Sequence, residues 1–230
     1  MGERAILVRF SGGIRPDLLN TVLEARKRLL ENIVEVKVHV ITTYDSLAVI
    51  YPTRIEKIYE EVLQVECLLK DLGPAPLKGN REYRIPVCYH QKFALDLIQL
   101  SVEKDLEPRT IVDLHTAGLY TVYFLGFLPG FPYLGGLDER LHTPRRNSPR
   151  SQVMKGAVGI GGEQTGIYPE ESPGGWHIIG NCPIRLFDPG RNPPCQIQAG
   201  DRLRFYEISL EEHRGILEAS KTGTYQLERI

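Results

Sequence analysis

The sequence predicts an α+β protein with two domains, a small α/β domain over residues 1–80 and a closed β-barrel domain over residues 81–230. The first 80 residues alternate helical and strand-like hydrophobic patterns. In contrast, 15 of the 22 glycines and 10 of the 16 prolines lie between Gly118 and Gly200, which indicates a different architecture there. Hydrophobic residues make up 42% and charged residues 25% of the chain, so a substantial globular core is expected.

The first domain shows the order strand, helix, strand, strand, helix. Pro16 is a typical first residue of a helix, and leucines follow it at helical spacing. The predicted elements span residues 5–10, 16–30, 34–40, 47–51 and 54–72. This order matches the start of a ferredoxin-like domain. A strand over 83–89 either completes that domain or, because the linker-like stretch 73–80 precedes it, begins the second domain.

The second domain continues with two short helices and then a series of short strands separated by turns. The predicted helices span residues 93–104 and 108–116, and the predicted strands span residues 120–128, 156–160, 166–168, 176–180, 184–187 and 202–208. Many short strands with dense Gly and Pro favour a closed barrel, because closure removes exposed strand edges. A final helix over 210–220 is expected to cover one end.

Composition and spacing exclude several classes of function. A net charge of −1 disfavours nucleic acid as the partner. The six histidines and four cysteines show no metal-ligand spacing and no disulfide framework, so we expect no metal and a reducing, cytoplasmic location. The stretch 114–137 lacks charges, but prolines and glycines break its second half, and no membrane span or signal peptide is predicted.

Two segments are candidates for ligand contact. The loop 128–136 places Pro129, Phe131 and Tyr133 on a shaped turn, which is either a binding loop or a packed barrel turn. The segment 143–155 carries four cations in thirteen positions. Its guanidinium groups suit a carboxylate or a phosphate, and its stiffening prolines favour an anion clamp over a solvated loop. The anion-binding candidates here are Arg145, Arg146 and Arg150.

Two further segments are rich in glycine. The first, residues 156–168, offers backbone N–H groups to an anion. It is not a Walker loop, and it is not a dinucleotide fingerprint because Gln164 stands where the third glycine of that fingerprint is required. Its candidates are Gly161, Gly162, Gln164, Thr165 and Gly166, with Tyr168 as a pocket wall. The second holds the single tryptophan, either a pocket wall or a buried anchor. Its candidates are Ser172, Gly174, Gly175 and Trp176.

Several motifs together resemble one family. They are GFLPGFPYLGGLD at 126–138, PRR at 144–146, GIGGEQTGIYP at 159–169, SPGGW at 172–176 and LFD at 186–188. In this order and spacing they resemble the KipI/PxpB family, also called allophanate hydrolase subunit 1. The resemblance is strong from about residue 83 to 208 and covers the first domain in layout only. It implies a cyclophilin-like barrel as the second domain.

The resemblance also implies an activity. PxpB pairs with a PxpC subunit and works with PxpA in the ATP-dependent opening of 5-oxoproline to L-glutamate, with Mg as the counter-ion of ATP. The alternative is a KipI-like inhibitor of a sporulation sensor histidine kinase, countered by a KipA partner. We expect a non-autonomous subunit, with ATP shared with or bound by the partner, because no catalytic nucleophile, acid or base can be assigned from the residues.

One segment departs from the family pattern. Family members commonly carry a Gly-Gly-Glu-Phe-Gly-type sequence after the Val-Cys-Tyr strand, whereas this chain has His90, Gln91 and Lys92 before Phe93 and Ala94. Any family role carried by that loop is therefore not transferred to this chain.

Overall fold

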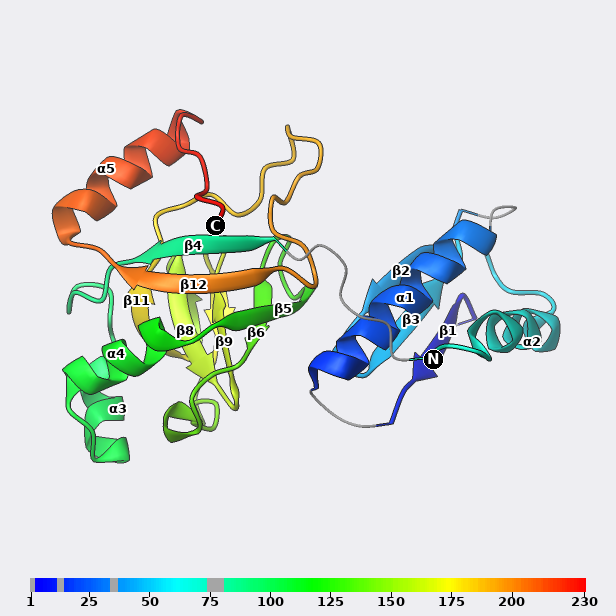
Figure 1. Cartoon of the computed structure of the whole chain (residues 1–230), viewed down its shortest axis with the longest axis horizontal. Helices are drawn as coiled ribbons and strands as arrows, with labels where there is room; N and C mark the ends of the chain where they lie inside the picture. Colours follow the sequence, from blue (N-terminus) through cyan, green and yellow to red (C-terminus); the bar gives the residue numbers. More distant parts are fainter. Residues whose placement is uncertain (1–2, 12–14, 34–36, 74–80) are drawn as a thin grey trace. The chain divides into compact units, whose positions relative to one another are not determined.

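The computed structural model describes residues 3–11, 15–33, 37–73 and 81–230. The chain divides into two compact units, Met1–Gly79 and Asn80–Ile230 (Figure 1). Each unit has its own hydrophobic core, built by different elements.

The first unit is a three-stranded antiparallel sheet with two helices. Its elements are β1 (Ala5–Arg9), α1 (Pro16–Asn32), β2 (His39–Thr42), β3 (Ser46–Ile50) and α2 (Ile58–Leu69). The sheet order is β1-β3-β2, which is the ferredoxin-like arrangement for these strands. Leu47 and Val49 of β3 are fully buried with Ala25 and Leu29 of α1 in one core cluster. The spacing of apolar residues therefore predicts this unit well.

The boundaries in this unit differ in two places. The predicted strand over 34–40 begins only at His39, and residues 34–36 lie outside the described part of the chain. The helix predicted from residue 54 starts at Ile58. The strand that follows α2 in the chain, β4 (Glu82–Val87), joins the sheet of the second unit.

The second unit is a nearly closed barrel. The strands are β5 (Tyr120–Leu125), β6 (Pro132–Gly135), β7 (Arg150–Val153), β8 (Ala157–Gly161), β9 (Gln164–Ile167), β10 (Ser172–Gly174), β11 (His177–Asn181) and β12 (Arg202–Glu207). Seven strands form one sheet in the order β11-β8-β9-β6-β5-β12-β4. The two ends of this sheet meet, because Cys88 and Asn181 exchange backbone hydrogen bonds of 2.9 and 3.0 Å. Strands β7 and β10 form a separate two-stranded sheet.

Three helices and one short 3-10 turn surround the barrel: α3 (Leu97–Lys104), α4 (Pro108–Ala117), η1 (Glu139–Leu141) and α5 (Leu210–Lys221). Helix α5 follows β12 and lies beside the edge strands of the barrel (Figure 1). It starts with a capping box, in which the Ser209 hydroxyl accepts from the Glu212 N–H and the Glu212 carboxylate accepts from the Ser209 N–H. The predicted bounds of this helix are confirmed within one residue.

The structure corrects two predictions about the barrel. Residues 132–135, predicted as loop, form β6, since a proline at the first position of a strand does not interrupt its ladder. Residues 184–187, predicted as a strand, form none, and Phe187 makes only an isolated bridge to Cys195. Prolines on both sides of that segment remove N–H donors that a ladder needs. No helix in the described residues is long and apolar enough to cross a membrane.

Candidate functional site

The candidate site is built on the hairpin of β8 and β9. In its register Gly159 pairs with Gly166 and Gly161 pairs with Gln164. Because side chains alternate along a strand, these four positions share one face. The intervening positions, Val158, Ile160, Thr165 and Ile167, are all fully buried in the barrel. The glycines and Gln164 therefore lie on the outer face of the hairpin.

Aromatic rings pack directly on these glycines. A Cβ atom at Gly161 would lie 2.6 Å from Cδ1 of Trp176, and one at Gly166 would lie 2.9 Å from Cε1 of Phe131. Both distances are shorter than an ordinary van der Waals contact, so only glycine fits without a shift of the ring. The glycine pattern of this segment thus has a packing cause.

The predicted use of glycine N–H groups as anion donors remains a prediction. The N–H of Gly162 already donates to the carbonyl of Thr143, so this donor is occupied in the folded chain. Gly162 has a φ of +67°, which lets the hairpin turn tightly at this point.

We call Phe127, Phe131, Tyr133, Tyr168 and Trp176 the outer aromatic cluster. Phe131 lies at its centre, with ring centroids 5.4 Å from Trp176, 5.1 Å from Tyr168 and 4.8 Å from Tyr133. Phe131, Tyr168 and Trp176 are almost fully buried, so these three rings form a second small core outside the barrel. Of the predicted pocket walls in this cluster, only Tyr133 is half-exposed.

Phe127 is the exposed ring of the cluster, and it is not among the residues that the sequence predicts for the site. Its side chain is 61% exposed, and it meets Phe131 and Tyr168 edge-on. Its φ of +66° is unusual for a bulky residue. Such strain persists only where the surrounding structure fixes it, and it is concentrated at functional sites. No sequence pattern reveals a left-handed phenylalanine.

Asp96 binds two arginines of the basic segment 143–155. Its carboxylate is 2% exposed and accepts hydrogen bonds from Arg146 Nη1 at 2.9 Å, from Arg150 Nη1 at 2.8 Å and Nη2 at 2.6 Å, and from the N–H of Ile178 at 2.6 Å. Charge-assisted bonds of this length are strong. One buried carboxylate therefore ties the loop to β11.

This ion cluster changes the interpretation of two predicted anion-binding residues. In the folded chain Arg146 and Arg150 bind the carboxylate of Asp96, and their proposed contact with a ligand stays a prediction. The sequence pattern pointed to the cations but not to their partner. The available signal was Asp96 itself, an acid within an apolar stretch directly before α3.

Arg145 is held differently. Its neighbours Pro144 and Arg146 are fixed, since His177 Nε2 donates to the carbonyl of Pro144 at 3.0 Å and Arg146 is bound to Asp96. Its own guanidinium is exposed and lies 5.9 Å from the ring centroid of Trp176, a cation–π contact. Within the described ranges Arg145 makes no ion pair. It is therefore a cation presented to solvent on a rigid support.

Gln164 contributes an acceptor. Its Oε1 atom is buried and has no hydrogen-bond partner within the part of the chain that the structure describes. Unpaired buried acceptors are rare in folded proteins. Because Gln164 pairs with Gly161, which lies under Trp176, this acceptor belongs to the same outer face as the aromatic cluster and Arg145.

Thr165 lies on the opposite face of the hairpin and is fully buried inside the barrel. Tyr89 Oη donates to His115 Nδ1 at 2.7 Å, His115 Nε2 donates to Thr165 Oγ1 at 2.9 Å, and Thr165 Oγ1 donates to the carbonyl of Gly159 at 2.9 Å. This chain leaves the Thr165 hydroxyl no free proton. Burial lowers the pKa of His115 to about 3, so its ring is neutral.

The remaining predicted residues are placed as follows. Pro129 is exposed beside Phe127, whereas Ser172 and Gly174 lie on β10, and Gly175 accepts from the N–H of Arg146. A Cβ atom at Gly174 would lie 2.5 Å from the Tyr168 hydroxyl. Among the described residues no group of three or more His, Cys, Asp or Glu side chains is placed to hold a metal ion.

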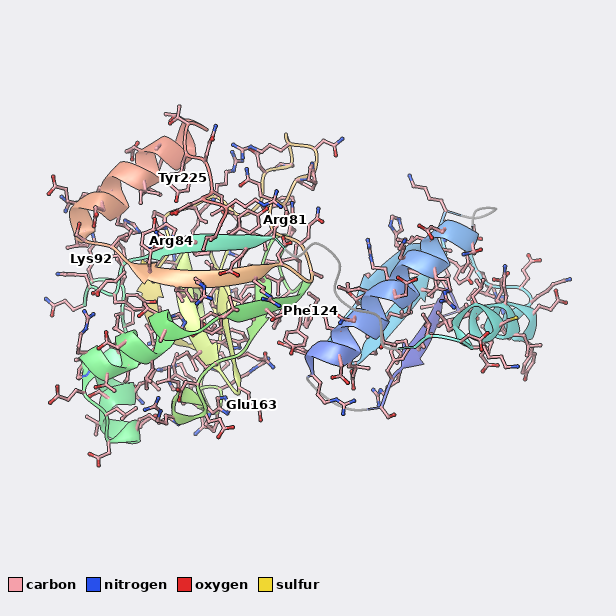
Figure 2. The ribbon with its side chains drawn as sticks, in the orientation of Figure 1. Arg81, Arg84, Lys92, Phe124, Glu163 and Tyr225 are labelled. Carbon is pink, nitrogen blue, oxygen red and sulfur yellow. The ribbon has the colours of Figure 1, made fainter. Side chains whose placement is uncertain are left out.

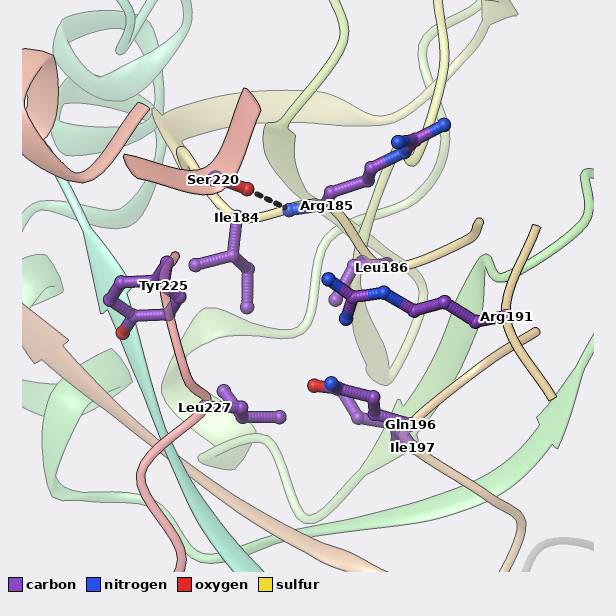
Figure 3. Close-up of a pocket in the computed structure, with 9 residues that line it drawn as sticks. All are labelled: Ile184, Arg185, Leu186, Arg191, Gln196, Ile197, Ser220, Tyr225 and Leu227. Atoms are coloured by element: carbon purple, nitrogen blue, oxygen red, sulfur yellow. Dashed lines mark hydrogen bonds between the residues drawn. The ribbon is translucent and has the colours of Figure 1, made fainter. Parts of the chain in front are cut away.

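A small hollow lies between the C-terminal tail and the segment 184–197 (Figure 3). Arg191 and Gln196 point into it between Leu227 and Ile184. Its volume is about 20 Å³, room for little more than a water molecule. Arg191 also approaches Asp188 at 3.4 Å. This hollow is too small for an organic substrate. The outer face of the β8–β9 hairpin is the candidate site because it gathers the predicted glycines, Gln164 and Trp176 in one place.

The fold and a family match define the class of protein, a barrel protein of the carboxyltransferase-domain type. The chain matches the family described as carboxyltransferase domain, subdomain C and D, over residues 1–197. It belongs to this family and, within it, to the KipI/PxpB group that its motifs predict. A 5-oxoprolinase subunit of Bacillus subtilis is 37% identical over 96% of each chain.

Solved structures share the fold. PH0987, a conserved uncharacterized protein from Pyrococcus horikoshii, is 38% identical over 93% of this chain and 98% of its own, with a TM-score of 0.56. The urea carboxylase of Kluyveromyces lactis superimposes with a TM-score of 0.82 over this whole chain and 23% of its own. At 18% identity this second likeness shows the fold alone.

Proposed function

We propose that this chain is the PxpB-type subunit of an ATP-dependent 5-oxoprolinase, which opens 5-oxoproline to L-glutamate together with PxpC-like and PxpA-like partners. The observation that carries the proposal is the near full-length similarity to a 5-oxoprolinase subunit of Bacillus subtilis. Shorter matches of 45% and 49% identity to proteins of the same name in Haemophilus influenzae and Escherichia coli support it.

The outer face suits part of this substrate. 5-Oxoproline carries a carboxylate, a lactam N–H and an apolar ring. Arg145 is a rigidly supported cation for the carboxylate, and Gln164 Oε1 is an unpaired acceptor for the N–H within the described part of the chain. The exposed ring of Phe127 offers an apolar contact. In the proposal these groups orient the substrate, and the partner supplies the reacting groups.

ATP does not fit the predicted anion-binding set as a whole. Asp96 accepts from Arg146 and Arg150, so these three side chains together carry one positive charge, and the Gly162 N–H is occupied. A triphosphate with Mg needs several free cations or N–H groups. We therefore assign the ATP and Mg sites to the partner subunit.

The test is reconstitution. The chain, a PxpC-like subunit and a PxpA-like protein are purified, and ATP-dependent glutamate release from 5-oxoproline is measured for each alone and for the mixture. We expect turnover only in the mixture, and a complex of this chain with the PxpC-like subunit on size-exclusion chromatography. Turnover by this chain alone, or a mixture without activity, contradicts the proposal.

A variant pair tests the site. Arg145→Ala removes the supported cation, and we expect a loss of about 10–100-fold in kcat/KM, the value of one hydrogen bond to a charged group. The matched control is Arg140→Ala, an exposed arginine that pairs with Asp138 outside the outer face. Equal kcat/KM in both variants removes Arg145 from the site.

A second candidate function is inhibition of a sporulation sensor histidine kinase. The observation that favours it is Phe127, since an exposed and conformationally fixed aromatic residue is typical of a protein-docking surface. Kinase autophosphorylation is measured with excess chain and with Phe127→Ala. Inhibition that Phe127→Ala abolishes supports this function, and unchanged autophosphorylation with excess wild-type chain rejects it for that kinase.

A further inference from the structure

A separate cavity of about 350 Å³ lies between helix α5 and the barrel. Its lining comes from the segment after β4, the segment between β7 and β8, the segment after β11, and α5. No residue of the outer aromatic cluster lines it. Its volume is within the range of pockets that bind small molecules.

Most of the cavity wall is apolar. The apolar lining residues are Phe93, Met154, Cys182, Pro183, Ile184, Leu210 and Leu217. Two polar lining residues, His213 and Asn181, bind each other: His213 Nε2 donates to Asn181 Oδ1 at 2.8 Å, and Asn181 Nδ2 donates to the carbonyl of Lys155 at 2.9 Å. The interior therefore suits the apolar body of a ligand.

Every ionised side chain that lines the cavity is a cation, whereas no Asp or Glu lines it. The cations are Lys92, Lys155 and Arg214. Lys155 pairs with Glu170 at 2.6 Å, but Lys92 and Arg214 make no ion pair with any residue in the described ranges. The charge of Lys92 also lowers the pKa of His213, after the larger effect of burial. A ligand with an anionic group would relieve this uncompensated positive charge.

Lys92 lies on the segment where this chain departs from its family, and Figure 2 shows it on the surface of the barrel unit. It is exposed, whereas the next residue, Phe93, is buried and packs on His213 with ring centroids 4.5 Å apart. This juxtaposition places an exposed cation directly beside the apolar interior.

We propose that this cavity binds a small monocarboxylate with an apolar body, whose chain lies against Phe93 and Leu217 and whose carboxylate pairs with Lys92 and Arg214. This site is independent of the proposed 5-oxoprolinase function, so either can fail alone. The opposite arrangement, an amine in the same cavity, is disfavoured because it would add a fourth cation without an acid.

The probes are three eight-carbon molecules that share one apolar chain: octanoate, octanol and octylamine. Binding to the purified full-length chain is measured by isothermal titration calorimetry. We expect saturable binding of octanoate with a Kd below about 1 mM, weaker binding of octanol, and no binding of octylamine. Octanoate that fails to saturate in this range, or octylamine or octanol that binds equally well, overturns the proposal.

Variants locate the site. Lys92→Glu with Arg214→Glu reverses both unpaired cations, and we expect octanoate binding at least about tenfold weaker. Lys221→Glu is the control for a single charge reversal, because it reverses one cation on α5 outside the cavity and should keep the wild-type Kd. Leu217→Trp fills the cavity and should remove binding, with circular dichroism confirming its fold. Equal binding by the double variant and the control places octanoate elsewhere and overturns the proposal.

Discussion

The two faces of the β8–β9 hairpin differ in chemistry although alternating residues of the same two short strands form them. On the inner face, Thr165 is fully buried, and its hydroxyl closes a hydrogen-bond chain that starts at Tyr89 and passes through His115. On the outer face, Gly161 and Gly166 lie against aromatic rings, and the Gln164 acceptor has no partner among the described residues.

The difference shows how period-two alternation divides a motif. Gln164 and Thr165 are neighbours in sequence and are equally plausible ligand contacts by residue type. In a strand they point to opposite sides, so only one of them faces the outer aromatic cluster. The inner face is a satisfied polar network that supports stability, whereas the outer face, within the described ranges, retains an unpaired acceptor and a free cation.

The largest expected effect comes from removing the anchor of the outer face. Asp96→Ala leaves Arg146 and Arg150 close together without their carboxylate, and the free energy of unfolding should fall by about 3–5 kcal/mol. Urea unfolding is followed by the fluorescence of Trp176, the single tryptophan, which reports on the barrel. Asp113→Ala, an exposed acid paired with Arg109, should change stability by less than about 0.5 kcal/mol. Equal losses of unfolding free energy in the two variants would show that the buried Asp96 ion cluster stabilises the fold no more than an exposed ion pair does.

The second effect is a pH dependence of the inner face. His115 has a pKa of about 3 in the folded barrel, below its usual 6.5, so the unfolded chain binds a proton that the folded chain excludes. The stability that neutral His115 contributes is complete above about pH 6.5. As the pH falls toward 3, the free energy of unfolding decreases by about 1.4 kcal/mol per pH unit. Unfolding is compared at pH 7 and pH 5 for wild type and His115→Gln. A stability difference between the two proteins that does not shrink at pH 5 contradicts this account.

The third effect tests the packing of rings on glycine. Gly161→Val places side-chain atoms where the Trp176 indole lies and should cost about 1–3 kcal/mol. Gly215→Ala on α5 is the control, because its position has open space, and it should stabilise the helix by about 0.5–1 kcal/mol. Trp176 fluorescence in the folded state should shift for Gly161→Val only. An unshifted fluorescence spectrum together with an unchanged free energy of unfolding would contradict direct packing of Trp176 on Gly161.

The smallest effects compare adjacent residues directly. Thr165→Val removes the acceptor of His115 Nε2–H and the hydroxyl donor to the Gly159 carbonyl, and it should lower the free energy of unfolding by about 1–2 kcal/mol. Gln164→Met removes a buried acceptor that has no partner in the described part of the chain, so the free energy of unfolding should stay the same or rise by up to about 1 kcal/mol. Urea midpoints measured side by side decide the comparison, and a larger loss for Gln164→Met would reverse the assignment of the two faces.

Local patterns in the sequence predicted much of the secondary structure. The helix that begins at Pro16, the strand at 47–51 and the final helix after Ser209 lie close to their predicted positions, since each is set by apolar periodicity and by residues at its ends. The density of short strands with glycine and proline predicted the barrel. Strand β6 was missed because Pro132 and Gly135 are typical loop residues, although pairing with β5 and β9 holds residues 132–135 in the sheet.

The site divides in the same way. The sequence by itself determined which segments carry aromatic residues, glycines and arginines, because residue type and spacing are local. The tertiary structure alone decided that Asp96, some fifty residues before Arg146 and Arg150, binds both, and that Phe127 is the exposed ring while Phe131 and Trp176 are buried. Charge pairing and burial depend on contacts between distant strands, and the free energy of such contacts is set only when the barrel closes.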